Sequence, residues 1–164
     1  MTQDTTQNKK GAIAVWVPGL NQTGGIQAFS NSLIQALIQN KYESIYVVSK
    51  HDTEEYFSAN ANKSGRSQIT FYLFGNIPNT FRTIAFAFGL FWTSAFCRPK
   101  LIIVGLAQFA FVARIIKFIF GIPYLVFAYG VEVWELPRWG VKSGLKNADL
   151  ILAISQHTKD KVLE

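Results

Sequence analysis

The residues best suited to chemistry follow a short apolar run in the last third of the chain. Residues 123–128, Pro-Tyr-Leu-Val-Phe-Ala, have the continuous hydrophobicity of a strand covered on both faces of a parallel sheet. Next come Tyr129, Gly130, Glu132 and Trp134. Ligands of open parallel sheets bind beyond the carboxyl ends of the strands, where a phenol, a carboxylate and an indole could bind hydroxyl groups, move a proton and stack. The alternative is that both rings only pack at the rim and the carboxylate only favours a helix N-terminus.

A second candidate site is the loop 18–25, Pro-Gly-Leu-Asn-Gln-Thr-Gly-Gly, which joins an apolar strand to a helical pattern. Gly24 and Gly25 permit close backbone approach to a ligand, and the helix N-terminus favours a negative group such as phosphate. The loop has neither the Lys-Ser/Thr of a P-loop nor the G-x-G-x-x-G of a dinucleotide-binding fingerprint. The alternative is a tight turn that only admits the helix.

Other polar residues give weaker signals. Ser155 is suited to cap a helix that begins at Gln156, and it lies at the same predicted edge of the sheet. His51 and His157 stand alone, which favours surface positions over roles as a base or a metal ligand. The sequence contains no nucleophile elbow, no metal-ligand spacing and no paired carboxylates. No cofactor and no metal are therefore expected.

The elements that must position these residues alternate between strand and helix. Strands are predicted at residues 12–17, 44–49, 68–74, 101–104, 123–128 and 150–154. Helices are predicted at residues 26–38, from a cap at Asn79 or Thr80 to Cys97, and at 108–120, 141–146 and 156–163. This alternation indicates a three-layer, Rossmann-like α/β domain, whose mostly parallel sheet of about six or seven strands has helices on both faces.

The helix predicted between Phe81 and Phe96 is apolar on almost every face. A membrane span needs roughly 20 consecutive apolar residues, and Arg82 and Arg98 leave only about 15 between them. A buried core helix is the favoured interpretation, and a helix with one face on lipid is the alternative.

Composition and charge limit the remaining choices. The chain has 164 residues, is 49% hydrophobic, and contains one cysteine, Cys97, which fits one globular domain in a reducing cytoplasm. Residues 1–10 are predicted to be a disordered polar leader, and residues 11–164 the domain. The net charge is +6, and no acid occurs between Asn76 and Phe127.

The cations of that acid-free segment are interleaved with apolar residues, which favours an anionic membrane surface over nucleic acid as a partner. The residues predicted to face the membrane are Arg98, Lys100, Arg114 and Lys117. The expected location is the cytoplasm, peripherally on the inner face of the membrane.

Three segments in register carry a family resemblance. Residues 24–33, 123–134 and 148–158 together resemble the N-terminal, acceptor-side domain of family 4 glycosyltransferases, and the resemblance covers nearly the whole chain from Gly11. It implies a GT-B architecture, two Rossmann-like domains with the active cleft between them. It also implies retaining, metal-independent transfer of a sugar, hexosyltransferase-like, from a nucleotide-sugar to a glycan or lipid-linked acceptor.

The resemblance also implies roles for residues. Gly24 and Gly25 would face the donor diphosphate. Tyr129 and Glu132 become the candidates for catalysis, and the cleft would be lined by Tyr129, Gly130, Glu132, Trp134, Ser155 and Thr158. Gly130, Glu132 and Trp134 match the family's His-Gly-x-Glu-x-Trp run, but Tyr129 stands where the family has His. A phenol titrates near pH ~10 and is a poor base at neutral pH.

A second departure is that the sequence ends at Glu164, before the domain that in the family binds the nucleotide and supplies a Glu pair. The sequence therefore predicts an N-terminal portion of a glycosyltransferase, truncated or one half of a split enzyme, that is inactive without a C-terminal domain or partner chain. One alternative is a non-catalytic Rossmann-like module that binds a partner or a membrane. Another is an integral membrane fragment built on residues 81–127.

Overall fold

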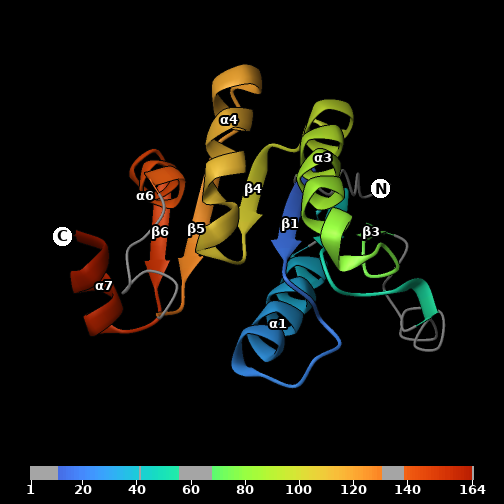
Figure 1. The fold of residues 1–164 in the computed structure, drawn as a ribbon, viewed down its shortest axis with the longest axis horizontal. Helices are drawn as coiled ribbons and strands as arrows, with labels where there is room; N and C mark the ends of the chain where they lie inside the picture. The colour runs from blue at the N-terminus through green and yellow to red at the C-terminus, as the bar shows by residue number, and fades with distance from the viewer. Residues whose placement is uncertain (1–10, 41, 56–67, 131–138, 164) are drawn as a thin grey trace, which may run out of the picture.

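The computed structural model describes residues 11–40, 42–55, 68–130 and 139–163 (Figure 1). In these ranges the chain forms one six-stranded, all-parallel sheet in the order β3-β2-β1-β4-β5-β6. The strands are β1 (Ile13–Val17), β2 (Ile45–Ser49), β3 (Ile69–Leu73), β4 (Leu101–Val104), β5 (Tyr124–Ala128) and β6 (Leu150–Ala153). The Rossmann-like α/β prediction is confirmed.

Helices cover both faces of the sheet. They are α1 (Gly25–Gln39), α3 (Asn79–Cys97), the 3₁₀ turn η2 (Ala107–Phe109), α4 (Ala110–Phe120), α6 (Trp139–Lys146) and α7 (Gln156–Leu163). Alternate residues of β1 point to opposite faces, as strand geometry requires. Ala14 and Trp16 pack with α3, α4 and α6, whereas Val15 and Val17 pack with α1. The two cores therefore lie on either side of β1 and β4.

The layer of α4 and α6 depends on close backbone contact. A Cβ added at Gly144 of α6 would lie 2.4 Å from the carbonyl carbon of Ala110, so the two helices can approach only because residue 144 is glycine. The fully buried Tyr124 donates its hydroxyl to the Gly144 carbonyl oxygen. Burial, and next the charge of Asp149, raise the pKa of Tyr124 to about 12.

The prediction that the helix after residue 78 is buried all round is wrong. One side of α3 packs inward through Phe86, Gly89 and Leu90, and a Cβ at Gly89 would collide with the Phe74 ring. The other side presents five large apolar residues that are 50–71% exposed: Phe81, Ile84, Phe88, Trp92 and Phe96. A helix on a sheet buries only the stripe that faces the strands, and no described residue covers the opposite stripe.

The helix α3 ends at Cys97 as predicted, but its N-terminal cap differs from the prediction. The helix begins at Asn79 with Pro78 as the N-cap residue, and no side chain caps it, so neither Asn79 nor Thr80 is the cap. At the other end Arg98 adopts the left-handed conformation, with φ 41° and ψ 58°. None of the described helices has the length and hydropathy needed to cross a membrane.

Candidate functional site

The strand order places a topological switch point between β1 and β4. The chain runs outward from β1 through β2 to β3, and then returns to the other side of β1 for β4, β5 and β6. The loops after β1 and β4 therefore run in opposite directions from the carboxyl edge of the sheet. Open parallel sheets bind ligands at such a point.

Gly105 lies at this switch point, directly after β4. Its amide donates to the Trp16 carbonyl oxygen at 2.8 Å, and a Cβ added at Gly105 would lie 2.6 Å from that same oxygen. Glycine is therefore required for the two strand ends to approach. Sequence reasoning did not single out Gly105, although a glycine immediately after an apolar strand is a recognisable signal.

A buried carboxylate fixes the loop after β1. Asp52 is 2% exposed and accepts three hydrogen bonds: from the amides of Leu20 at 2.7 Å and Asn21 at 3.0 Å, and from the Ser49 hydroxyl at 2.7 Å. The Asn31 side chain adds a bond to the Leu20 carbonyl oxygen at 3.1 Å. Charge-assisted bonds of this kind hold a loop firmly. Asp52 is a second residue that sequence reasoning missed, and its signal is an acid three residues beyond a buried strand.

The held loop leads into an open helix N-terminus. Gly24 is the N-cap residue of α1, no side chain caps the helix, and its first turn contains no acid. Gly24 has extended backbone angles that any residue can adopt, and a Cβ there would meet only the flexible amide end of Gln27. A Cβ at Gly25 would meet nothing within 4 Å. The first amides of α1 therefore have no side-chain cap, and an uncapped helix N-terminus favours an anion.

The exit of β5 packs against the same helix. The Tyr129 ring stacks on Phe127 with centroids 6.3 Å apart and meets Phe29 of α1 edge-on at 5.9 Å. Phe29 lies one helical turn beyond Gly25, so the structure brings the predicted loop and the predicted Tyr129 into one neighbourhood. Gly130 follows with φ 149°, a conformation that L side chains rarely adopt.

At the exit of β6, Ser155 caps α7 as predicted. Its hydroxyl accepts from the Thr158 amide at 3.1 Å, and the two side-chain hydroxyls lie 2.9 Å apart. Thr158 is fully buried, whereas Ser155 is exposed. The cleft role of both residues stays a prediction. Glu132 and Trp134 lie outside the described residues.

His51 also lies at this edge. It is exposed as predicted, and its Nδ1 lies 3.2 Å from Nη1 of Arg82. Burial, and then the positive charges of Lys50 and Arg82, lower the pKa of His51, so the ring is neutral at pH 7 and can accept from the guanidinium. Arg82 also donates to the carbonyl oxygens of Ile77 and Gly75 at 2.9 Å each. This pair joins α3 to the loop after β2.

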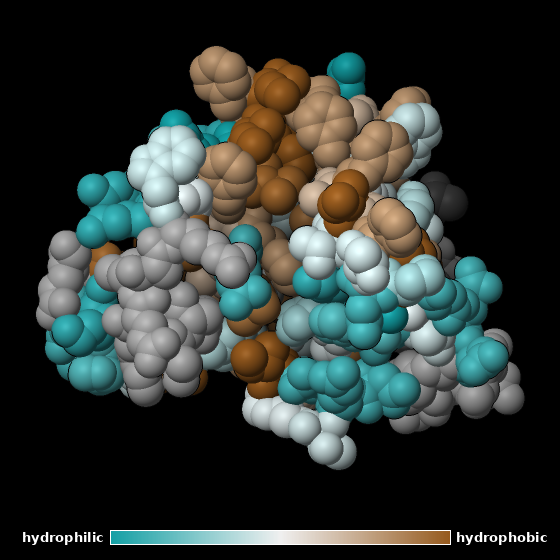
Figure 2. Space-filling model, in the orientation of Figure 1, coloured by the Kyte–Doolittle hydropathy of each residue, from teal (hydrophilic) through white to brown (hydrophobic). Residues whose placement is uncertain are grey.

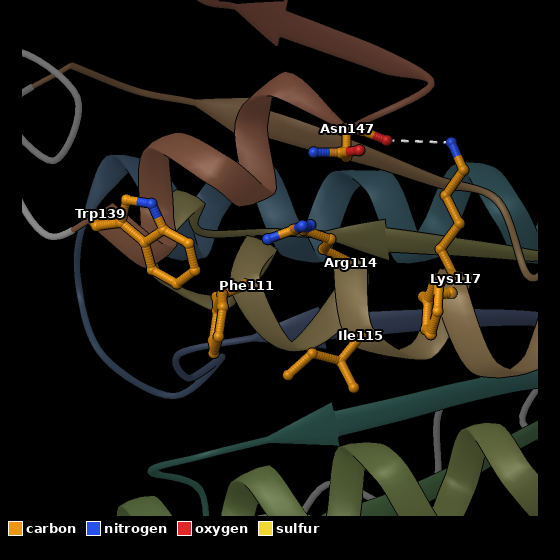
Figure 3. Close-up of a pocket in the computed structure, with 7 residues that line it drawn as sticks. Phe111, Arg114, Ile115, Lys117, Trp139 and Asn147 are labelled. Atoms are coloured by element: carbon orange, nitrogen blue, oxygen red, sulfur yellow. Dashed lines mark hydrogen bonds between the residues drawn. The ribbon is translucent and has the colours of Figure 1, made fainter.

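The four predicted membrane-facing cations separate into two groups. Lys117 donates to the Asn147 carbonyl oxygen at 3.0 Å (Figure 3). It also forms an ion pair with Asp149 at 2.7 Å, and Arg114 donates to the Ser143 hydroxyl. Both line an open pocket of about 650 Å³ between α4 and α6, with Asn147 and the apolar Phe111, Ile115, Phe118 and Trp139. Arg98 and Lys100 are exposed elsewhere, at the amino edge of the sheet.

The described residues contain no candidate metal site. Within residues 11–40, 42–55, 68–130 and 139–163, no three His, Cys, Asp or Glu side chains come together in a way that could hold an ion. The expectation of metal-independent chemistry stays a prediction.

No model of a protein family and no curated protein matches this chain. Solved structures do match. The Anabaena protein Alr3699/HepE in complex with UDP has a TM-score of 0.57 and 12% identity, over 94% of this chain and 40% of that one. A Listeria monocytogenes protein named as a UDP-N-acetylglucosamine 2-epimerase has a TM-score of 0.60 and 14% identity, over 94% and 42%.

Two further matching structures differ from each other in chain length. Another UDP-N-acetylglucosamine 2-epimerase has a TM-score of 0.57 and 16% identity, over 94% of this chain and 44% of that one. VPA0982 from Vibrio parahaemolyticus, of unknown function, has a TM-score of 0.50 and 12% identity, over 95% and 98%. The likeness shows a GT-B-like, Rossmann-type fold, and the chain spans less than half the length of the first three matches.

Proposed function

We propose that this chain is the N-terminal, acceptor-side part of a retaining glycosyltransferase of family 4, which moves a sugar from a nucleotide-sugar to a glycan or lipid-linked acceptor. The observation that carries the proposal is the open N-terminus of α1 at the switch point, held in place by Asp52. Two structural neighbours named for UDP-sugars and one solved with UDP support it.

In this proposal the helix N-terminus at Gly24 and Gly25 faces the donor diphosphate, because its amides donate hydrogen bonds and its dipole favours negative charge. The acceptor lies along the exits of β5 and β6, from Tyr129 and Gly130 to Ser155 and Thr158. Glu132 and Trp134 join this wall through the resemblance alone.

Tyr129 and Glu132 are the candidates for catalysis. The Tyr129 phenol can bind a sugar hydroxyl but is a poor proton acceptor at neutral pH, since phenols titrate near pH ~10. A carboxylate such as Glu132 is the better acceptor of a proton or a hydroxyl hydrogen bond. The transfer is proposed to need no metal, and the protein to work peripherally at the cytoplasmic face of a membrane.

The chain spans 40–44% of the two neighbours named for UDP-N-acetylglucosamine and of the one solved with UDP, so we propose that a second, nucleotide-binding domain completes the site. The purified chain should then turn over neither UDP- nor GDP-sugars by itself, and turnover should appear when the nucleotide-binding domain is supplied. Turnover by the 164-residue chain alone would contradict this part of the proposal.

Gly24→Asp tests the diphosphate role directly. The new carboxylate would cap α1 and repel phosphate, so we expect an unchanged or slightly raised stability together with about tenfold weaker UDP binding. Binding is measured with the nucleotide-binding domain supplied, by NMR titration of the backbone amides of this chain with UDP, and the shifts should centre on residues 24–28.

Two control variants separate charge from capping. Ser32→Asp adds the same charge at an exposed position two turns into α1 and should bind UDP like the wild type. Gly24→Ser completes a capping box with Gln27 without adding charge, and should change the free energy of unfolding by only a few tenths of a kcal/mol. Equal UDP affinity in Gly24→Asp and the wild type would rule out the diphosphate role.

A non-catalytic module that binds a partner is the second candidate. It is favoured by the match to VPA0982, because this chain covers 98% of that solved chain and the two are therefore of similar length. The module hypothesis predicts no UDP shifts at residues 24–28 and no turnover even with a nucleotide-binding domain supplied.

A further inference from the structure

We propose that the outer surface of α3 and α4 is a docking face for an anionic lipid bilayer. This α3–α4 face consists of the exposed Phe81, Ile84, Phe88, Trp92 and Phe96 of α3 and Ile115, Phe118 and Ile119 of α4. It lies on the helix layer and not at the carboxyl edge of the sheet, and it does not depend on sugar transfer.

The apolar side chains of α3 form one continuous stripe. Spacings of three or four residues put them on one side of a 19-residue helix, about 28 Å long at 1.5 Å per residue. Their rings touch in sequence: Phe88 and Trp92 have centroids 6.0 Å apart, and Trp92 and Phe96 4.0 Å. The stripe therefore runs the full length of the helix.

The stripe of α4 lies beside it. Phe91 of α3 and Phe120 of α4 bring the helices together with ring centroids 5.3 Å apart, and Phe118 is 90% exposed. Figure 2 shows brown and tan residues gathered across the upper part of the view, where Figure 1 places α3 and α4. The face continues over Ile115 and Phe118 into the pocket between α4 and α6, which has room for apolar chains beside Arg114.

Charge decides which occupant this face fits. Residues 68–130, which include both helices, contain five Lys or Arg residues and no acid: Arg82, Arg98, Lys100, Arg114 and Lys117. Arg98 and Lys100 line a hollow of about 510 Å³ with Ile119 and Phe120 of α4. Two exposed cations beside exposed apolar side chains match the headgroups and acyl region of an anionic bilayer.

Arg98 also holds a backbone position that costs energy. It is the only described residue other than glycine with a positive φ, and it ends α3 as Gly121, at φ 70°, ends α4. Glycine is the ordinary choice for such a helix end because it has no Cβ. An arginine at this position places a cation at the rim of the α3–α4 face, although its left-handed backbone conformation is strained.

A second copy of this chain is a poorer occupant. A symmetric dimer through the α3–α4 face would place the cations of both copies at one interface, and neither helix carries an acid to pair with them. The headgroups of an anionic bilayer carry the charge opposite to that of Arg98 and Lys100, and a fluid bilayer can adapt to the shape of the face. We therefore assign the face to lipid.

Vesicle co-sedimentation tests the assignment. The wild-type chain should bind phosphatidylglycerol vesicles more tightly than phosphatidylcholine vesicles, and 0.5 M NaCl should remove most of the difference. Removing both rim cations in Arg98→Gly/Lys100→Gln should weaken binding to the anionic vesicles by roughly fivefold per cation and leave the neutral ones unchanged. Lys159→Gln, which removes an exposed lysine of α7, is the matched control for Lys100→Gln and should bind normally.

Apolar insertion is tested separately. Phe88→Gln/Trp92→Gln should weaken binding to both kinds of vesicle, since it removes exposed aromatic area from a helix that glutamine tolerates. Brominated lipids should quench the tryptophan fluorescence of the wild type, and Trp92→Phe should weaken that quenching.

The outcomes that would overturn the proposal need no variant. Equal binding to anionic and neutral vesicles, or no binding by a chain with native circular dichroism, would remove the lipid assignment. If light scattering shows a stable dimer that buries Trp92 and does not bind vesicles, the α3–α4 face is instead the interface with a second copy of the chain. UDP titration is unaffected by any of these results, so the docking face and the proposed sugar transfer can fail independently, whereas the proposed work at a membrane rests on the docking face.

Discussion

At the scale of single residues, Asp52 organises the candidate site without touching a ligand. Its two oxygens accept from the Leu20 and Asn21 amides and from Ser49, so one carboxylate joins the exit of β2 to the loop that precedes α1. A neutral side chain at this position cannot accept all three bonds, and a buried donor left without a partner costs about 1–3 kcal/mol.

Asp52→Asn should therefore lower the free energy of unfolding by about 1–3 kcal/mol, because its NH2 group would face N–H donors. Urea denaturation measures the change. Asp160→Asn alters an exposed carboxylate on α7 that only accepts from Gln156, and should cost less than about 0.5 kcal/mol. Equal stability of the two variants would show that Asp52 does not hold the loop.

Tyr124 should make the protein sensitive to alkali. Burial, followed by the charge of Asp149, raises the pKa of Tyr124 to about 12 in the folded state, whereas an unfolded tyrosine titrates near 10. A raised pKa contributes stability that is present below pH 10 and is lost as the pH rises toward 12. Tyr124→Phe should therefore show a smaller fall in the free energy of unfolding over this pH range than the wild type. Parallel pH profiles for the two proteins would contradict the assignment.

At the scale of elements, α3 and α4 both end in a residue with the left-handed backbone conformation, Arg98 in α3 and Gly121 in α4. Gly121 needs φ 70°, and a Cβ there would meet nothing within 4 Å, so only the backbone opposes another residue. Arg98 accepts φ 41° despite its Cβ. Comparing variants at these two positions measures the free energy that a residue with a Cβ loses in the left-handed conformation.

Gly121→Ala should destabilise the protein by about 1–2 kcal/mol, since a left-handed residue with a Cβ is strained by that amount. Arg98→Gly relieves the same strain but gains freedom in the unfolded chain, so its net effect should stay within about 1 kcal/mol. Thermal unfolding measures both. A large destabilisation by Arg98→Gly would mean that the side chain has structural contacts beyond its charge.

At the scale of the whole molecule, stability is concentrated in the middle of the sheet. Ile102 in the central β4 is fully buried, whereas Leu152 of the edge strand β6 is 39% exposed. Leu150 of β6 and Ile154, directly after the strand, are also exposed. In the described chain fewer side chains are therefore buried toward that edge of the sheet.

Ile102→Ala should cost about 2–5 kcal/mol, because the removed methyl groups leave a cavity among packed neighbours. Leu152→Ala should cost less than about 1 kcal/mol, because water already reaches that side chain. Urea unfolding of both variants tests the contrast. Similar losses would indicate that β6 is covered in solution.

Much of the architecture could be predicted from local patterns. The apolar runs at residues 13–17, 101–104 and 124–128 specify buried strands, and the periodicity of α1 and α4 specifies helices, because side-chain direction alternates with fixed periods. The Ser155 cap was also predictable, since one hydroxyl and the next amides suffice to form it. In the site, the sequence pointed to Gly24, Gly25 and Tyr129 through their place after strands.

Only the tertiary structure shows how these residues meet. The switch point, the contact of Phe29 with Tyr129 and the triple role of Asp52 join segments about 30 to 100 positions apart, and no local pattern encodes such pairings. The same holds for the exposed stripe of α3. Its composition alone suggested a helix buried all round, and the side left uncovered became visible only once the sheet and α4 had taken their places, because burial depends on neighbours and not on hydrophobicity.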